Sequence, residues 1–247
     1  MTLHRHRIRI PATAMVLAAG KGLRMRPLTE TRPKPLVKLA GKTLLDRALD
    51  LLDATIVRHA IVNVHYLGEQ IIDHVKTRIA PAVLISDERG ELLDTGGGIA
   101  KALPLIGSRP FFLINSDSTW RDGPSPALLR LAEMFDEKQM DGVLLLIAPE
   151  RGIGFDGPGD FRLGADRRLT RAGAGDTAAL AYMGVAILSP KMFAGAPRGA
   201  FSLNILFDRA IAAGRLFGLV HEGDWMHVGT PQALRQAEEF LAATTTR

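Results

Sequence analysis

The chain has 247 residues, of which 47% are hydrophobic and 23% charged, a composition typical of a globular protein that can bury a core. It has no cysteine, which excludes disulfide frameworks, thiolate metal sites and cysteine nucleophiles and favours a reducing compartment, so we expect a cytoplasmic protein. The formal net charge of +5 is spread along the chain without a basic block, and no apolar run approaches the roughly 18 residues of a membrane helix. We therefore expect phosphate-bearing ligands rather than nucleic acid or a membrane.

Short apolar runs alternate with amphipathic segments through the first half of the chain. This pattern predicts strands at 12–18, 60–64, 81–85, 111–115 and 142–148, with helices at 44–54, 69–79 and 95–103. Thr43 is expected to cap the first helix. The alternation of strand and helix predicts a Rossmann-like α/β fold, in which a mostly parallel sheet is flanked by helices on both faces.

The second half of the chain has a different pattern. Residues 152–175 are rich in Gly, Asp and Arg and predict loops with short antiparallel strands. Further elements are expected at 180–188 (strand), 202–213 (helix), 216–220 (strand) and 231–243 (closing helix). We therefore expect a single domain over 1–247, in which the half 12–150 builds most of the sheet and the half 151–247 adds a small antiparallel subregion.

A glycine-rich turn follows the first strand, within the sequence LAAGKGLRMRPLT at 17–29. Gly20 and Gly22 let the backbone approach a ligand closely and point its N–H groups at an anion. Lys21, Arg24 and Arg26 add positive charge at the carboxyl edge of the sheet, where open α/β folds bind ligands. An ordinary strand-to-helix turn is the alternative interpretation, which the basic cluster disfavours.

Two better-known phosphate loops do not fit the sequence. Met25 stands where the dinucleotide fingerprint needs its third glycine, and Leu36 stands where a Walker A loop ending at 41–43 needs its first. The next motif is Pro33-Lys34-Pro35, in which two prolines are expected to hold the backbone extended. Lys34 could then present its ammonium to a phosphate, or the motif could be a rigid turn with a solvated lysine.

Together, the glycine-rich turn and the proline-flanked lysine resemble the signature of the sugar-1-phosphate nucleotidyltransferases, almost continuously over 17–37. The resemblance implies the nucleotide-diphospho-sugar transferase fold, with a nucleotide-binding half (12–150) and a sugar-binding half (151–247). It implies an enzyme that joins a nucleoside triphosphate to a sugar 1-phosphate and releases pyrophosphate, with Mg²⁺ as cofactor. The implied nucleotide-binding residues belong to this turn and to a second glycine-rich turn: Ala18, Ala19, Gly20, Lys21, Gly22, Gly96 and Gly97.

The resemblance also implies catalytic and metal-binding residues. Arg24 and Lys34 would contact the phosphates, and Asp117 would hold the metal at the end of the strand 111–115, unless it merely caps a turn. The family's closing motif, Trp-x-Asp-Val-Gly-Thr-Pro, is matched at 225–231 except that His227 replaces the acid that is usually the second metal ligand. Imidazole suits Mg²⁺ less well than carboxylate. Four roles therefore remain open for His227. It could bind the metal weakly, favour Mn²⁺ over Mg²⁺, contact a phosphate instead, or have a purely structural role.

The family builds its sugar pocket from segments that here contain Asn115, Tyr182, Gly184 and Asn204, although Asn204 could equally begin a helix near Ser202. The motifs are most similar to short members that uridylylate N-acetylmuramate 1-phosphate, and members that guanylylate mannose 1-phosphate are the alternative. The lactyl carboxylate of N-acetylmuramate calls for a cationic or amide partner. Four candidates lie close in sequence: Arg162, Arg167, Arg168 and Arg171. Because position 227 lacks the usual acid, a protein that binds nucleotide sugars as a sensor, without catalysis, is an alternative from another functional class. No segment predicts an oligomeric interface.

Overall fold

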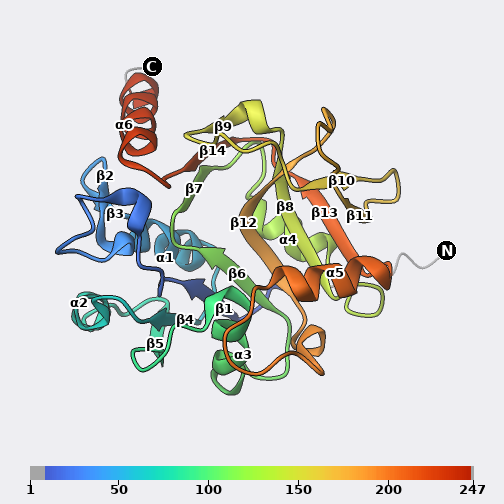
Figure 1. The fold of residues 1–247 in the computed structure, drawn as a ribbon, viewed down its shortest axis with the longest axis horizontal. Helices are drawn as coiled ribbons and strands as arrows, with labels where there is room; N and C mark the ends of the chain where they lie inside the picture. Colours follow the sequence, from blue (N-terminus) through green and yellow to red (C-terminus); the bar gives the residue numbers. More distant parts are fainter. Residues whose placement is uncertain (1–8, 246–247) are drawn as a thin grey trace.

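The computed structural model describes residues 9–245, and within them the chain builds a seven-stranded central sheet (Figure 1). The strand order is β13-β8-β12-β6-β1-β4-β5. The strands are β1 (Thr13–Leu17), β4 (His59–Val64), β5 (Ala82–Asp87), β6 (Phe111–Asn115), β8 (Gly142–Ile147), β12 (Ala181–Leu188) and β13 (Leu216–Val220). β12 is antiparallel to both of its neighbours, whereas the other pairs are parallel.

Helices cover both faces of this sheet and make a three-layer structure. One face packs against α1 (Leu44–Ala54), α2 (Gly68–Val75) and α4 (Ala127–Met134), and the other against α3 (Asp94–Ile106) and α5 (Asn204–Ala212). The closing helix α6 (Pro231–Thr245) stands at one corner of the molecule, away from the sheet (Figure 1).

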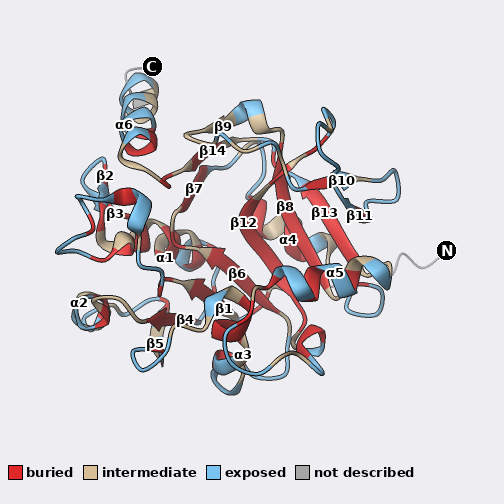
Figure 2. Ribbon diagram, viewed as in Figure 1, coloured by how far each residue is buried: buried red, intermediate tan, exposed pale blue. Residues whose placement is uncertain are grey.

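The strands of the central sheet are apolar because helices cover both of its faces. Along β1, Ala14 and Val16 belong to the core on the α1 side, whereas Met15 belongs to the core on the α3 side, and all three are fully buried. A strand covered on both faces needs apolar residues at consecutive positions, which explains why these segments are continuous apolar runs rather than alternating ones. Figure 2 shows the central strands as the buried part of the molecule.

A smaller sheet connects the end of β6 to the closing motif. It contains β7 (Ser118–Arg121), β14 (Asp224–His227) and β9 (Gly152–Ile153), in the order β7-β14-β9. β7 is antiparallel to β14 and places Ser118 opposite His227. The backbone N–H of Val228 donates to the carbonyl of Asp117 at 3.0 Å. These contacts bring two segments that are about a hundred residues apart in sequence to the same place.

Two short hairpins complete the strands of the described chain. They are formed by β2 (Lys38–Leu39) with β3 (Lys42–Thr43), and by β10 (Phe161–Leu163) with β11 (Leu169–Arg171). Single 3₁₀ turns occur at η1 (Leu23–Met25), η2 (Lys34–Leu36), η3 (Pro149–Arg151) and η4 (Pro190–Phe193).

The predicted fold class is confirmed, and the expected strands and helices of the sheet are present with shifts of a few residues at their ends. Thr43 caps α1 as predicted, because its hydroxyl accepts from the N–H of Asp46 at 3.0 Å. The sequence analysis did not predict α4, β7 or β14. It was also wrong about the backbone at Lys34: Pro33 is extended, but Lys34 begins a 3₁₀ turn that ends at Leu36.

None of the helices formed by residues 9–245 combines the length and apolar character needed to cross a membrane.

Candidate active site

A cavity of about 580 Å³ opens at the carboxyl ends of β1, β4 and β6. The sequence analysis pointed to this edge of the sheet, because ligands of open α/β folds bind there. The cavity is lined by most of the residues predicted from the two early motifs and from β6: Ala18, Ala19, Gly20, Gly22, Arg24, Lys34, Asn115 and Asp117. The structure thus brings these residues together, and their individual roles remain predictions.

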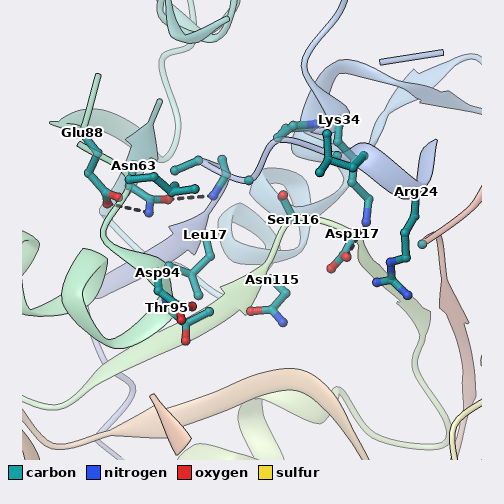
Figure 3. A pocket seen from close by; sticks show the side chains of 18 residues that line it. Leu17, Arg24, Lys34, Asn63, Glu88, Asp94, Thr95, Asn115, Ser116 and Asp117 are labelled. Atoms are coloured by element: carbon teal, nitrogen blue, oxygen red, sulfur yellow. Dashed lines mark hydrogen bonds and ion pairs between the residues drawn. The ribbon is translucent and has the colours of Figure 1, made fainter. Parts of the chain in front are cut away.

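At one end of the cavity, Lys34 and Asp117 form an ion pair, with Nζ of Lys34 donating to Oδ2 of Asp117 at 2.6 Å (Figure 3). The side chains are 13% and 21% exposed, so both are largely shielded from water. Burial alone would raise the pKa of Asp117, but the charge of Lys34, the charge that His227 carries when it is protonated, and the hydrogen bond from Lys34 lower it below the usual value. Asp117 is therefore an ionised carboxylate facing a cavity at neutral pH.

His227 lies at the end of β14, and aromatic rings hold its imidazole in place. The ring centre is 5.6 Å from that of Trp225 and 6.0 Å from that of Phe155, which it meets edge-on. Gly229 leaves space for the ring, since a Cβ built at Gly229 would lie 2.8 Å from Nε2 of His227. Any larger residue at 229 would have to displace the imidazole.

The protonation state of His227 follows from its surroundings. Burial is the main cause that lowers its pKa below the usual value, and the charges of Lys34 and Arg24 act in the same direction. Asp117 and Asp156 oppose the shift without reversing it. His227 is therefore a neutral imidazole at pH 7, with one ring nitrogen able to accept a hydrogen bond or to bind a metal.

The donor set limits what kind of metal site can exist. Among residues 9–245, no group of three or more His, Asp or Glu side chains could enclose a metal ion. Asp117 and His227 would supply at most two protein ligands. Mg²⁺ often binds through one or two carboxylates together with water and substrate phosphates, so this end of the cavity fits a cation that arrives with a phosphate ligand.

The opposite end of the cavity contains a buried polar pair that the sequence analysis missed. Asn63 accepts from the N–H of Ala18 at 2.7 Å and donates to Oε1 of Glu88 at 2.7 Å (Figure 3). The other carboxylate oxygen of Glu88 accepts from the N–H of Leu93 at 3.3 Å. Glu88 is fully buried, and burial raises its pKa above the usual value, although hydrogen bonds from Asn63 and Leu93 oppose the shift. The signal was a polar residue within the apolar strand β4 and an acid directly after β5.

Other cavity residues lie between these two ends. Leu92, Asp94 and Thr95 line the cavity where α3 begins, and Ser116 lines it beside Asp117. Thr95 also accepts from the N–H of Leu203 at 2.9 Å, which ties the start of α3 to the segment before α5.

Gly96 and Gly97 are not brought to the cavity. Their N–H groups donate to the carbonyl of Phe201 at 2.9 and 3.1 Å and are therefore already used. A Cβ at Gly96 would clash with the ring of Phe201, and one at Gly97 would clash with the carbonyl of Gly199. Glycine is needed here because a distant part of the chain packs directly on α3.

Five other predicted residues also lie outside the cavity lining: Lys21, Tyr182, Gly184, Asn204 and His227. Lys21 is exposed. Tyr182 packs edge-on against Phe207 with ring centres 5.8 Å apart, and its buried hydroxyl has no hydrogen-bond partner among the described residues. Asn204 is exposed, begins α5 and accepts from Arg171 at 2.9 Å. For Asn204 the structure thus agrees with the alternative of a helix-start position.

The candidate arginines for a lactyl carboxylate do not line the cavity either. Three of them form ion pairs elsewhere: Arg162 with Asp176, Arg168 with Asp166 and Arg171 with Asp208. The fourth, Arg167, lies exposed between β10 and β11.

Gly184 lies at a bulge in β12 and contacts Asn115 closely. Its φ is +71°, and a Cβ would lie 2.6 Å from Nδ2 of Asn115. We expect Gly184→Ala to lower the free energy of unfolding by about 2–4 kcal/mol, because left-handed backbone costs roughly 1–2 kcal/mol and overpacking adds a similar amount. Urea denaturation measures the loss.

Gly175→Ala is the matched control, because Gly175 has a φ of +75° but nothing lies within 4 Å of its Cβ position. It should lose only the backbone contribution, about 1–2 kcal/mol. Equal losses in the two variants would mean that the contact with Asn115 has no energetic effect.

A cavity that holds an ionised aspartate, a largely shielded lysine and a glycine-rich turn at the carboxyl edge of a Rossmann-like sheet is typical of proteins that bind phosphorylated nucleotides. The comparison with known protein families identifies the family to which the chain belongs. The chain belongs to the nucleotidyl transferase family, whose model matches residues 13–152, and it is a nucleotidyltransferase.

Full-length relatives share the sequence beyond the matched region. The chain is 47% identical over 236 residues to the N-acetylmuramate alpha-1-phosphate uridylyltransferase of Caulobacter vibrioides, covering 94% of this chain and 98% of the relative. It is 36% identical over 233 residues to the enzyme of the same name from Neisseria meningitidis, with 93% and 98% coverage.

Solved structures share the fold at low sequence identity. A UDP-glucose pyrophosphorylase complexed with UDP-glucose superposes with a TM-score of 0.74 at 16% identity, covering 95% of this chain and 99% of the other. The inositol-1-phosphate CTP transferase from T. maritima superposes with a TM-score of 0.73 at 18% identity, covering 94% and 98%.

Proposed function

We propose that this protein transfers the uridylyl group of UTP to N-acetylmuramate 1-phosphate in the cytoplasm and releases pyrophosphate, as a step in the recycling of peptidoglycan. The ion pair of Lys34 and Asp117 at the phosphate end of the cavity is the structural observation that carries the proposal. The full-length similarity to two uridylyltransferases supports the choice of substrates.

The proposed reaction is a single in-line displacement. A phosphate oxygen of the sugar 1-phosphate attacks the α-phosphorus of UTP, a new P–O bond forms, and the bond to the leaving pyrophosphate breaks. The attacking oxygen is already an anion at pH 7, so no general base is needed. The obstacle is repulsion between two polyanions, and catalysis would come from charge neutralisation and alignment.

The residues of the cavity suit these tasks. The turn from Gly20 to Gly22 offers backbone N–H groups to the β- and γ-phosphates, and Arg24 adds a positive charge beside them. Lys34 would neutralise charge near the α-phosphate. In this proposal, residues 12–150 hold the nucleotide and residues 151–247 hold the sugar.

Mg²⁺ is the proposed cofactor, with Asp117 as its first protein ligand and His227 as a weak second one. When bound, the ion would neutralise phosphate charge and stabilise the transition state. The ion pair means that Lys34 would have to share Asp117 with the incoming cation, and the phosphates of UTP provide the new partner for its ammonium.

A grid of pyrophosphate-release assays tests the proposal, with UTP, GTP, dTTP, CTP and ATP each combined with the 1-phosphates of N-acetylmuramate, N-acetylglucosamine, glucose and mannose. We expect kcat/KM to be highest for UTP with N-acetylmuramate 1-phosphate. A preference for GTP with mannose 1-phosphate would contradict the proposed substrates and support the alternative, a mannose-1-phosphate guanylyltransferase. That alternative is supported by 28% identity over 225 residues to a mannose-1-phosphate guanylyltransferase subunit of Danio rerio. Tight nucleotide binding without turnover would instead indicate a nucleotide-sugar sensor, the function that His227 in place of an acid favours.

A further inference from the structure

A mostly exposed segment, residues 23–33, connects the glycine-rich turn to Lys34. The residues on either side of this connecting segment, Gly22 and Lys34, both line the cavity. Lys34 is fixed independently by its ion pair with Asp117. The position of the glycine-rich turn relative to Lys34 therefore depends on how the connecting segment is held.

Two side chains beside the start of α2 hold the connecting segment. The hydroxyl of Tyr66 donates to the carbonyls of Thr29 and Glu30 at 2.9 and 3.1 Å, and the amide of Gln70 donates to that of Thr31 at 3.0 Å. Within the described chain, the other hydrogen bonds of the segment join residues that are close in sequence. The contacts with Tyr66 and Gln70 thus tie it to a distant part of the fold.

The turn that carries Tyr66 is itself anchored. The ring of His65 donates from Nδ1 to the carbonyl of Glu88 at 2.7 Å. In α2, Ile71 and Val75 are buried in the core against the central sheet. Tyr66 therefore extends from a well-supported element, and its hydroxyl gives the connecting segment a fixed reference point.

Thr29 transmits this constraint to the glycine-rich turn. Its side chain is buried, and its hydroxyl donates to the carbonyl of Gly22 at 2.7 Å. A Cβ built at Gly22 would lie 3.2 Å from Cγ2 of Thr29 and 3.1 Å from Cβ of Lys34, so Gly22 is packed between these two side chains. A shift of Thr29 would therefore move Gly22 relative to Lys34.

The turn itself has unused hydrogen-bond donors. Among the described residues, the backbone N–H groups of Gly20, Lys21 and Gly22 donate to no acceptor. In the proposed function this turn binds the β- and γ-phosphates, and the inference below rests on that function. Hydrogen bonds weaken steeply with distance and angle, so the contribution of these donors depends on where the turn is held.

We propose that Tyr66 is a positioning residue, which acts through Thr29 to set the glycine-rich turn at the distance from Lys34 that a nucleoside triphosphate requires. Tyr66 does not line the cavity, so it does not contact the ligand itself. The loss of one hydrogen bond of this kind corresponds to about fivefold to tenfold in affinity.

Equilibrium titration with UTP and with UMP tests the proposal, in the presence of Mg²⁺ and without a sugar 1-phosphate. We expect Tyr66→Phe and Thr29→Val each to raise the Kd for UTP about fivefold to tenfold. The Kd for UMP should stay within about twofold of the wild type, because UMP has no β- or γ-phosphate. Thr29→Ser keeps the hydroxyl and should bind UTP nearly as well as the wild type.

Thr55→Val is the matched control for Thr29→Val. Thr55 is also a buried threonine, and its hydroxyl donates to the carbonyl of Leu51 at 2.8 Å, outside the cavity. Its removal should lower the thermal unfolding midpoint without changing either Kd. The double variant of Tyr66→Phe and Thr29→Val tests whether the two residues act through one connection. Its Kd for UTP should be close to that of the weaker-binding single variant, because residues of one network do not add independently.

The outcomes separate this inference from the proposed function. If the substrate grid selects a nucleotide other than UTP, its triphosphate and monophosphate replace UTP and UMP. An unchanged ratio of the two Kd values in Tyr66→Phe overturns the positioning role, even if the unfolding midpoint falls, while nucleotidyl transfer stands. Effects that multiply in the double variant overturn the connection through Thr29. Failure of the wild type to bind any nucleoside triphosphate overturns the proposed function and this inference with it.

Discussion

Asp117→Ala is expected to lower kcat by about 100- to 1,000-fold, because the loss of a charged group that acts on the transition state costs roughly 3–4 kcal/mol. Two consequences of the substitution combine. The phosphates lose the carboxylate that would hold a cation beside them, and Lys34 loses the partner that fixes its ammonium at 2.6 Å. Pyrophosphate release at saturating substrate measures the change in kcat.

Removal of Asp117 also leaves the largely buried Lys34 without a counter-charge, so stability must be measured on the same preparations. Asp141→Ala is the matched control. Asp141 is 22% exposed, close to the 21% of Asp117, and it pairs with Arg215 at 2.8 Å outside the cavity. The Asp141→Ala variant should be less stable than the wild type but have the same kcat. Asp117→Ala with near-normal kcat would remove this residue from the mechanism.

Lys34→Ala is expected to lower kcat about a hundredfold, or roughly 3 kcal/mol. The lysine would neutralise charge near the α-phosphate, where the bond between phosphorus and the leaving oxygen breaks. Lys34→Arg should not restore full activity, since the planar guanidinium is larger and cannot replace a compact ammonium at the same place. Single-turnover kinetics separate this loss from an effect on product release.

Lys42→Ala tests whether any lysine–aspartate pair would give the same result. Lys42 pairs with Asp50 at 2.5 Å, but both side chains are well exposed and lie outside the cavity. We expect this variant to have wild-type kcat and a stability within about 1 kcal/mol of the wild type. If Lys34→Ala behaved in the same way, Lys34 would be a structural partner of Asp117 and nothing more.

The sequence was sufficient to predict the central sheet because burial on both faces imposes long apolar runs. Strands such as β6 and β8 contain five or six consecutive buried or nearly buried residues, and β4 and β12 contain runs of similar length. The helices between them repeat apolar residues at a spacing that places one side on the sheet.

The small sheet could not be predicted in the same way. β7, β14 and β9 have between two and four residues each, and β7 is part polar. Their pairing depends on contacts between segments far apart in sequence, which local patterns do not contain. The same reason explains Gly96: a glycine that permits close contact with Phe201 cannot be distinguished, in the sequence, from a glycine that faces a ligand.

The site was predictable to the extent that its residues belong to continuous motifs. Lys34 and Asp117 each belong to such a motif, and the structure brings them together across 83 positions of sequence. Asn63 and Glu88 belong to no motif. A single amide in an apolar strand and a single acid after another strand become informative only when the fold brings them into one hydrogen-bonded pair.

The reversed direction of β12 has a consequence for how such a protein can diversify. Because β12 is antiparallel to β6 and β8, its beginning lies at the edge where β6 ends, and Gly184 contacts Asn115 there. The stretch 152–180 leads directly into this beginning, whereas the turn at 18–22 extends from β1 on the other side of β6. A change of length in that stretch would alter the molecule on the β12 side of β6 and leave the turn at 18–22 in place, because loops tolerate such changes better than the strands they connect.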